Sequence, residues 1–329
     1  MKKAIVLILI ILLIPLNIYG ASDIDYYNAH IKEIKEYYPE FNIGDTKKLI
    51  KLNSKQDTVD ILKKLYGSID EYSGFYTSNE LGLNLFDKVE LVEKSIEFEI
   101  IDNIGYIIIP TFYNGVYYDV LFALEYMDEN NILNIVLDLR DNPGGDISES
   151  IKIAQLFVKE GLIAKIDYYS DELEDEEYYS SLKELKYKVI VIVNKETASA
   201  AELLTGAIKE SKSGYIIGEK TFGKSRVQKL IPIMTQETFH KNNNCTKNPT
   251  INYLKATKQG TFINGKSLLG WAKLTVGNFY IRSGKGIEGK GIESDYIFDE
   301  KQGDECLIIS CNKLFELDII VEDESILNR

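Results

Sequence analysis

A serine stands where a buried strand is expected to give way to a helix. The segment reads NKETASAAELL, and Ser199 follows the near-continuous apolar run Tyr187–Val193. A hydroxyl at a helix start lies beside backbone N–H groups that have no acceptor within the helix. Those groups could stabilise the oxyanion that forms when a serine attacks a carbonyl. The spacing Ser199-x-x-Glu202 is equally typical of a capping box, which only starts a helix.

A glycine pair offers a second piece of the same chemistry. The turn DNPGGD, Asp141–Asp146, follows a strand-like run and precedes a predicted helix. Gly144 and Gly145 can adopt a positive φ and let the backbone approach a ligand closely. They could present an N–H group to an oxyanion, or they could simply form a tight strand-to-helix turn.

Lys224 lies in GEKTFGKS, Gly218–Ser225, which fits the phosphate-binding pattern G-x-x-x-x-G-K-[ST]. That pattern binds phosphate only when a helix follows it. The next residues, SRVQKLIPIM, favour a strand instead, so we predict no nucleotide site.

A lysine can also act as the base for a serine, provided that its amine is neutral. Its pKa must then fall from about 10.4 to about 7, a difference of about 4 kcal/mol. Burial beside apolar groups lowers the pKa, and Phe222 is a candidate for such an apolar wall. The alternative is that Lys224 is a solvated surface charge.

Taken together, these segments resemble a known family. LDLRDNPGG, NKETASAAE and GEKTFGKSRVQ, in this order, resemble the C-terminal processing (tail-specific) serine peptidases. YGSIDEYSGFYTSNEL upstream and LTVGNFYIRSGKGIEGKGIESD downstream extend the likeness over about residues 60–297, apart from one insertion. The interval from Ser199 to Lys224 matches the family's serine-to-lysine interval.

The resemblance implies a role for each matching residue. Ser199 would be the nucleophile and Lys224 the general base, and Gln228 matches the glutamine that positions the lysine. The backbone amides of Gly145 and Ala200 match the oxyanion hole.

Glu202 lies where the family carries a supporting polar residue, and we treat it first as structural. Two departures from the family pattern stand out. Ser225 follows the lysine where the family usually has glycine. The segment from Leu81 to Ile101 is too short for the PDZ domain that many relatives carry, so the chain resembles a PDZ-less member, and specificity for a substrate's C-terminal tail cannot be inferred for it.

Strand-like runs alternate with helical ones, which indicates an α/β fold with a largely central sheet. The resemblance implies a crotonase-like α/β core. We expect a small helical N-terminal region at 22–95 and a peptidase catalytic domain at 96–329. The segment Met234–Gly270, rich in Asn, Lys, Thr and Gly, is predicted to be a surface insertion that could shape access to the substrate groove. Asp171–Glu177 (DELEDEE) is interpreted as a solvated loop or helix face.

The N-terminus predicts export. Lys2 and Lys3 precede the apolar run Ala4–Ile14, and small residues follow it, so residues 1–21 are predicted to be a signal peptide. An uncleaved anchor is the alternative, and it would be the only means of membrane association. The exported part would lie in the periplasm, the cell envelope or the extracellular space.

Composition excludes several other classes. The chain has 329 residues, 45% of them hydrophobic, and a net charge of −13, which argues against nucleic acid as a partner. Three cysteines suggest neither a disulfide framework nor a metal site. The two histidines, His30 and His240, stand in polar contexts without a paired carboxylate or cysteine motif, so another base than histidine is expected.

The sequence therefore predicts an exported serine endopeptidase that cleaves unstructured or extended polypeptide. It would use a Ser199–Lys224 dyad and an acyl-enzyme, without a metal or cofactor. A second hypothesis is a catalytically weak or inactive peptide-binding protein that keeps the peptidase fold.

Overall fold

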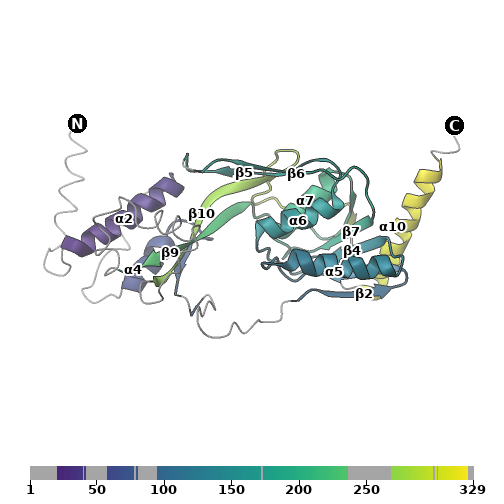
Figure 1. Ribbon diagram of the computed structural model, residues 1–329, viewed down its shortest axis with the longest axis horizontal. Coiled ribbons are helices and arrows are strands. Elements are labelled where there is room, and N and C mark those ends of the chain that lie inside the picture. The colour runs from purple at the N-terminus through teal and green to yellow at the C-terminus, as the bar shows by residue number, and fades with distance from the viewer. Residues whose placement is uncertain are drawn as a thin grey trace. The chain divides into compact units, whose positions relative to one another are not determined.

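The structure, a computed structural model, describes residues 21–39, 41, 58–77, 79–80, 95–171, 173–235, 268–298, 301 and 303–324. The chain divides into two compact units, and Figure 1 labels most of their elements. Each unit is built from segments that lie far apart in the sequence. The first unit holds Met1–Glu90, Tyr168–Leu173 and Val227–Gly277, and the second holds Leu91–Asp167, Glu174–Arg226 and Asn278–Arg329.

The second unit is organised by a six-stranded sheet in the order β11-β8-β7-β4-β3-β2. All neighbouring strands are parallel except β2 and β3, which are antiparallel. The strands are β2 (Glu97–Ile101), β3 (Ile104–Ile108), β4 (Asn134–Asp138), β7 (Lys188–Val193), β8 (Gly214–Gly218) and β11 (Tyr296–Ile297). β7, with the sequence KVIVIV, is buried at every position after its first, as expected for a central parallel strand.

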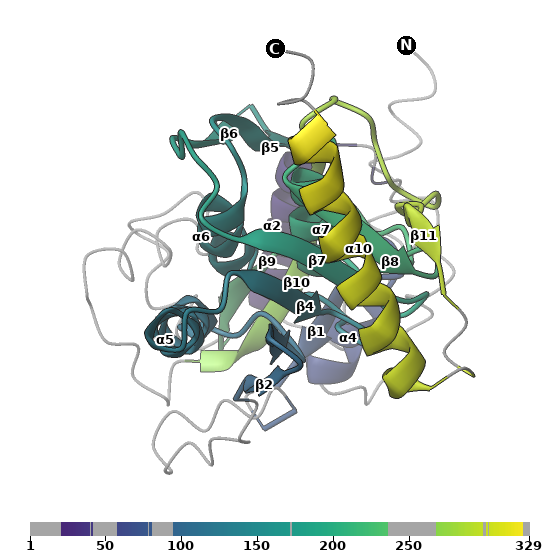
Figure 2. The same cartoon turned by 90° about the vertical axis from the view of Figure 1, so that its right-hand side faces the viewer.

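Four helices in the described residues of this unit accompany the sheet. They are α5 (Val116–Glu129), α6 (Ile147–Phe157), α7 (Ala200–Glu210) and α10 (Asp304–Glu324). Figure 2 shows α10 lying across the strands. Its apolar side chains Leu307, Cys311 and Phe315 are buried in one cluster with strand residues that include Val136 and Ile190. The C-terminal helix thus covers one face of the sheet.

β5 (Gly161–Tyr168) and β6 (Glu176–Ser180) form an antiparallel pair. The interpretation of Asp171–Glu177 as a loop or helix face is wrong at its end, because Glu176 and Glu177 begin β6. Both pair with β5 across the hairpin, Glu177 beside Lys165 and Glu176 beside Ile166.

The first unit contains α2 (Ala21–Tyr37), α4 (Thr58–Tyr66), β1 (Gly74–Tyr76), all of β9 (Arg226–Met234) except its first residue, and most of β10 (Leu268–Ile281). β10 pairs with β1 and β9, and its last residues enter the second unit. His30 is buried, with Nδ1 2.9 Å from the Tyr66 hydroxyl oxygen. Burial lowers the pKa of His30 to about 3.

The α/β prediction is confirmed, as are the buried strand within Tyr187–Val193 and the helices that follow Ser199 and the glycine pair. β10 begins at Leu268, inside the predicted insertion, and residues 236–267 of that insertion lie outside the described residues. Residues 1–20 of the predicted signal lie outside them as well. The predicted domain boundaries stay predictions. None of the helices in the described ranges is both long and apolar enough to cross a membrane.

Candidate active site

Two turns of the second unit lie side by side at one edge of the six-stranded sheet. We call them the β4 turn (Leu139–Asp146) and the β7 turn (Asn194–Ser199). They follow neighbouring parallel strands, whose carboxyl ends reach the same edge. A hydrogen bond from the Ala198 N–H group to the Asn142 carbonyl, 2.9 Å long, joins them directly.

Ser199 closes the β7 turn in a backbone conformation that residues other than glycine rarely adopt. Its φ is 56° and its ψ is −118°, and α7 begins at the next residue. Such a conformation costs about 1–3 kcal/mol and persists only where the surroundings hold it. A strained serine between a strand and a helix is also the way in which some hydrolases present a nucleophile. Ser199 is only 8% exposed, so its surroundings enclose it closely.

The two glycines of the β4 turn are required by their surroundings. Gly144 and Gly145 have φ values of 99° and 140°. A Cβ atom on Gly144 would lie 2.8 Å from the Ser199 Cβ and 3.0 Å from the Ala200 nitrogen. One on Gly145 would lie 2.2 Å from the Phe112 carbonyl oxygen. Gly144 therefore allows the β4 turn to touch the start of α7, and Gly145 allows it to touch the Phe112 backbone.

Two backbone amides beside Ser199 are open. Within the described part of the chain, the N–H groups of Gly145 and Ala200 donate to no protein acceptor. By contrast, the Gly144 N–H group donates to Asn142 Oδ1 at 2.8 Å. An anionic oxygen next to Ser199 could accept hydrogen bonds from open amides of this kind.

Glu202 connects Ser199 to the segment that carries Lys224. Its Oε2 accepts the backbone N–H groups of Ser199 (2.9 Å) and Lys224 (2.7 Å). Its Oε1 accepts the Gly223 N–H group (2.7 Å) and the Thr221 hydroxyl (2.6 Å). Burial raises the pKa of the Glu202 carboxyl, and these donors oppose that rise. The bond to Ser199 fits the capping-box interpretation, but Glu202 also holds a second loop.

The loop between β8 and β9, which we call the Lys224 loop (residues 219–225), is held against a glycine-rich segment that includes Gly289 and Gly291. Gly223 has a φ of 95°, and a Cβ atom there would lie 2.7 Å from the Gly291 nitrogen. The Gly289 N–H group donates to the Gly223 carbonyl at 2.8 Å. Lys224 itself is partly buried. Close backbone packing thus fixes where its main chain lies.

The neighbours of Lys224 differ from expectation. Phe222, the predicted apolar wall, is 52% exposed, so much of its ring faces solvent. Ser225, which replaces the family's usual glycine, is buried and bonded to Glu288. Its N–H group and hydroxyl donate to Glu288 Oε2 at 2.7 and 3.0 Å. Nothing in the spacing of the sequence pointed to Glu288.

The structure gathers Ser199, Ala200, Glu202, the glycine pair and the Lys224 main chain within the second unit. Gln228 lies in β9 and belongs to the first unit, so its contact with Lys224 stays a prediction. Strand β9 follows Lys224 where the phosphate-binding pattern needs a helix, as the sequence predicted, and the absence of a nucleotide partner stays a prediction.

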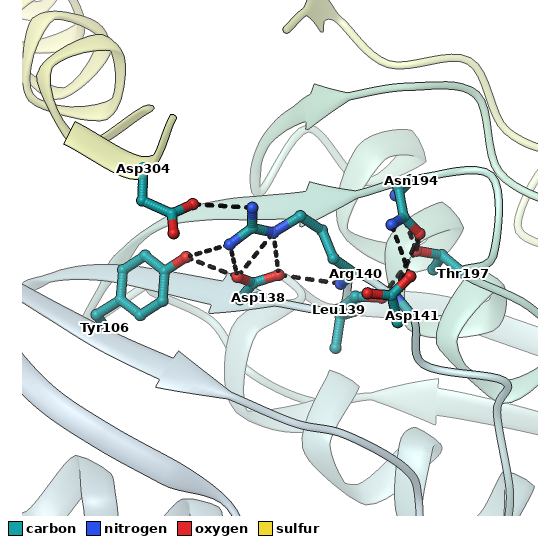
Figure 3. Close-up of polar contacts among 8 residues, drawn as sticks. All are labelled: Tyr106, Asp138, Leu139, Arg140, Asp141, Asn194, Thr197 and Asp304. Carbon is teal, nitrogen blue, oxygen red and sulfur yellow. Dashed lines mark hydrogen bonds and ion pairs between the residues drawn. The ribbon is translucent and has the colours of Figure 1, made fainter. Parts of the chain in front are cut away.

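A second polar network lies just before the β4 turn, as Figure 3 shows. Asp138, the last residue of β4, is 3% exposed and accepts the Arg140 guanidinium at 2.6 Å and the Tyr106 hydroxyl at 2.6 Å. Arg140 Nη1 also contacts Asp304, the first residue of α10, at 2.9 Å. Burial raises the pKa of Tyr106. This network ties β4 to β3 and α10.

Sequence reasoning missed Asp141 and Asn194, which bond to each other between the two turns (Figure 3). Each follows closely on a predicted buried strand, and that placement could have revealed them. In the described ranges, no group of three or more His, Cys, Asp or Glu side chains could hold a metal ion. Cys306 and Cys311 are free thiols, and Cys245 lies outside those ranges.

A strained serine at a helix start, beside open backbone amides, is typical of enzymes that transfer acyl groups. Comparison with known families agrees with this class. The model of peptidase family S41 matches residues 103–298 of this chain. The chain therefore belongs to peptidase family S41.

Curated relatives match shorter stretches. A probable CtpA-like serine protease of Staphylococcus epidermidis is 35% identical over 139 residues, which cover 42% of this chain and 28% of that protein. One of Staphylococcus aureus is 33% identical over 177 residues, 53% of this chain and 34% of that protein. The match thus spans about a third of these relatives' length.

Two solved structures share the fold. The photosystem II D1 C-terminal processing protease aligns with a TM-score of 0.56 at 16% identity, over 85% of this chain and 94% of that one. A lipoprotein from Streptococcus agalactiae aligns with a TM-score of 0.57 at 16% identity, over 90% and 99%. These likenesses confirm the predicted fold.

Proposed function

We propose that this protein is an exported serine endopeptidase with a Ser199–Lys224 dyad. The observation that carries the proposal is the shared Glu202 oxygen, which binds the main chains of both residues at 2.9 and 2.7 Å. One buried carboxylate thereby ties the loop of the base to the loop of the nucleophile.

In the first half of the reaction, neutral Lys224 Nζ takes the proton of the Ser199 hydroxyl while Oγ attacks the scissile carbonyl carbon. The carbonyl π electrons move to oxygen, and the resulting oxyanion accepts the N–H groups of Gly145 and Ala200. When the carbonyl re-forms, the C–N bond breaks, and the leaving amine takes the proton from Lys224. The product is an acyl-enzyme on Ser199.

The second half repeats these steps with water. Lys224 takes a proton from the water, whose oxygen attacks the acyl carbon and forms a second oxyanion at the same amides. Collapse returns the proton to Ser199 Oγ and releases the new carboxyl end of the peptide. The base is an amine, so no step requires a metal or cofactor. Gln228 is proposed to orient the amine.

The proposed substrate is an unstructured or extended polypeptide. An extended segment can pair its backbone with a sheet edge, a mode of recognition that tolerates varied side chains. The partly solvated Phe222, close to Thr197 through a 3.0 Å backbone bond, could contact an apolar side chain of such a segment.

The test is cleavage of unfolded casein by the purified protein. Ser199→Ala and Lys224→Ala should each abolish cleavage. Lys224→Arg is the matched control, because arginine keeps a long basic side chain but cannot become neutral near pH 7, so it should be equally inactive. Activity in either alanine variant would exclude the dyad.

A fluorophosphonate probe separates the two candidate functions. Labelling of Ser199 that is lost in Lys224→Ala supports the peptidase. Absence of labelling from pH 6 to 10, together with binding of unfolded casein, would support a peptide-binding protein that keeps the fold.

Export is proposed from residues 1–21. Fractionation of expressing cells should place the protein outside the cytoplasm, and N-terminal sequencing should begin after Gly20 or Ala21 if the signal is cleaved. An intact N-terminus in the membrane fraction would indicate an anchor, and a cytoplasmic protein would contradict export.

A further inference from the structure

Asp141 and Asn194 form a reciprocal pair between the two turns of the candidate active site. The Asp141 N–H group donates to Asn194 Oδ1 at 3.1 Å. Asn194 Nδ2 in turn donates to Asp141 Oδ1 at 3.0 Å. Figure 3 shows the two side chains facing each other. This pair connects the turns through side chains as well as main chain.

Asn194 also organises its own turn. It is only 4% exposed, its Oδ1 accepts the Glu196 N–H group at 3.1 Å, and its own N–H group donates to the Thr197 hydroxyl oxygen at 3.0 Å. Thr197 Oγ1 then donates to the Leu139 carbonyl at 2.7 Å, back in the β4 turn. The buried Asn194 amide therefore shapes the β7 turn and, together with the bonds from Ala198 to Asn142 and from Thr197 to Leu139, holds it at its distance from the β4 turn.

Asp141, the partner of Asn194 in the β4 turn, has a strained backbone conformation. Its φ of 58° is in the left-handed region, which Asp adopts more readily than most residues but still at a cost. The bonds to Asn194 fix this conformation at the start of the segment that leads to Gly145. A change in the pair would therefore shift the direction in which the glycine pair approaches Ala200.

We propose that Asp141 and Asn194 are positioning residues that set the spacing between the open N–H groups of Gly145 and Ala200. The proposal rests on the peptidase function proposed above. One amide comes from each turn, so both can reach the same oxyanion only while the turns keep their separation. Oxyanion donors act at 2.7–3.1 Å, and loss of one costs about 10²–10³ in kcat.

The decisive variant is Asn194→Asp. It removes the Nδ2 donor and sets a carboxylate against the Asp141 carboxylate, so the turns should move apart. We expect kcat to fall by about tenfold or more, with KM changed by less than about threefold, because the oxyanion exists only after substrate has bound. A purely structural role would lower the melting temperature without this separation of kcat from KM.

The exchange Asp141→Asn with Asn194→Asp is the matched rescue. It restores one amide and one carboxylate at the same two positions, with the total charge of the natural pair, and most of kcat should return. Asp304→Asn is the control, because it breaks a contact of the neighbouring Arg140 and leaves the pair intact, so kcat should stay within about twofold. If Asn194→Asp does not fold, Asp141→Ala breaks the same bond by removing its acceptor, from an exposed position.

A readout independent of activity separates this proposal from the peptidase function. The ¹H–¹⁵N signals of Gly145 and Ala200 in the full chain should shift in Asn194→Asp and return in the exchange. Unchanged signals, or a kcat that stays low when the exchange restores the melting temperature, would overturn the positioning role. Failure of the peptidase function would instead appear as no casein cleavage by the natural protein while the signals still shift.

Discussion

Two buried carboxylates of the second unit are satisfied in opposite ways. Asp138 is bound by a cation, since the Arg140 guanidinium contacts both of its oxygens. Glu202, which is fully buried, is bound only by neutral groups: three backbone N–H groups and the Thr221 hydroxyl. Both arrangements offset part of the cost of a buried charge, but they hold different parts of the molecule.

Asp138 links elements of the core, whereas Glu202 links two loops of the candidate active site. Through Arg140 and Tyr106, Asp138 ties β4 to β3 and to the first residue of α10. Glu202 ties the nucleophile's turn to the Lys224 loop, and each of its oxygens already accepts two bonds. A carboxylate has about four acceptor sites, so Glu202 has none left for an ammonium group. Such a carboxylate can position a lysine's main chain without a direct hydrogen bond that would favour its charged form.

The largest effect is expected from Glu202→Gln. The amide nitrogen would face two N–H or O–H donors where an oxygen stood, and each donor left unpaired costs about 1–3 kcal/mol. We expect a loss of about 2–4 kcal/mol in the free energy of unfolding and at least about a hundredfold loss of casein cleavage. Urea denaturation and initial rates measure the two effects. If the variant kept the natural activity, Glu202 would have no role beyond capping α7.

Asp138→Asn tests the other buried carboxylate. The asparagine keeps the shape but loses the charge that binds Arg140, and a hydrogen bond to a charged group contributes about 1.5–3 kcal/mol. Stability should fall by about 2 kcal/mol, while the rate per folded molecule stays within about threefold. If cleavage instead collapsed as in Glu202→Gln, the proposed division between the two carboxylates would be wrong.

A smaller effect is expected at Ser225, which a third carboxylate, Glu288, holds by two bonds. Ser225→Ala removes only the hydroxyl bond and should cost about 1 kcal/mol, with a loss of activity of a few-fold. Ser225→Gly, the family's usual residue, loses the same bond and gains backbone freedom, so it should be no better than alanine. Higher activity in the glycine variant would mean that the serine hinders the lysine.

The smallest effect is the pH dependence of stability, because burial and hydrogen bonds shift the pKa of Glu202 in opposite directions. Burial raises the pKa of the Glu202 carboxyl. The folded protein therefore keeps the carboxyl proton to a higher pH than the unfolded chain, in which a glutamate has a pKa of about 4.3. Stability contributed by Glu202 should therefore decrease as pH rises above that value. The difference in unfolding free energy between the natural protein and Glu202→Gln should be larger at pH 4 than at pH 6. A difference that grows with pH would reverse the sign of the pKa change.

The sequence predicted the core elements because their signals are local. β7 is a continuous apolar run, and the helices α5 and α6 carry periodic apolar positions. β5 and β6 were missed because β6 begins with two glutamates and its stability comes from the partner strand. The burial of His30 has no local signal either, because its partner Tyr66 lies 36 residues further along the chain.

By itself, the sequence determined which residue types could carry the chemistry, since a serine before a helix, a glycine pair and a lysine after a glycine are visible as letters. Only the tertiary structure decided that one Glu202 oxygen serves both Ser199 and Lys224, that Glu288 holds Ser225, and that Asp141 pairs with Asn194. These bonds join segments far apart in the chain. Their partners are chosen when the sheet aligns its strand ends, and no local pattern records that alignment.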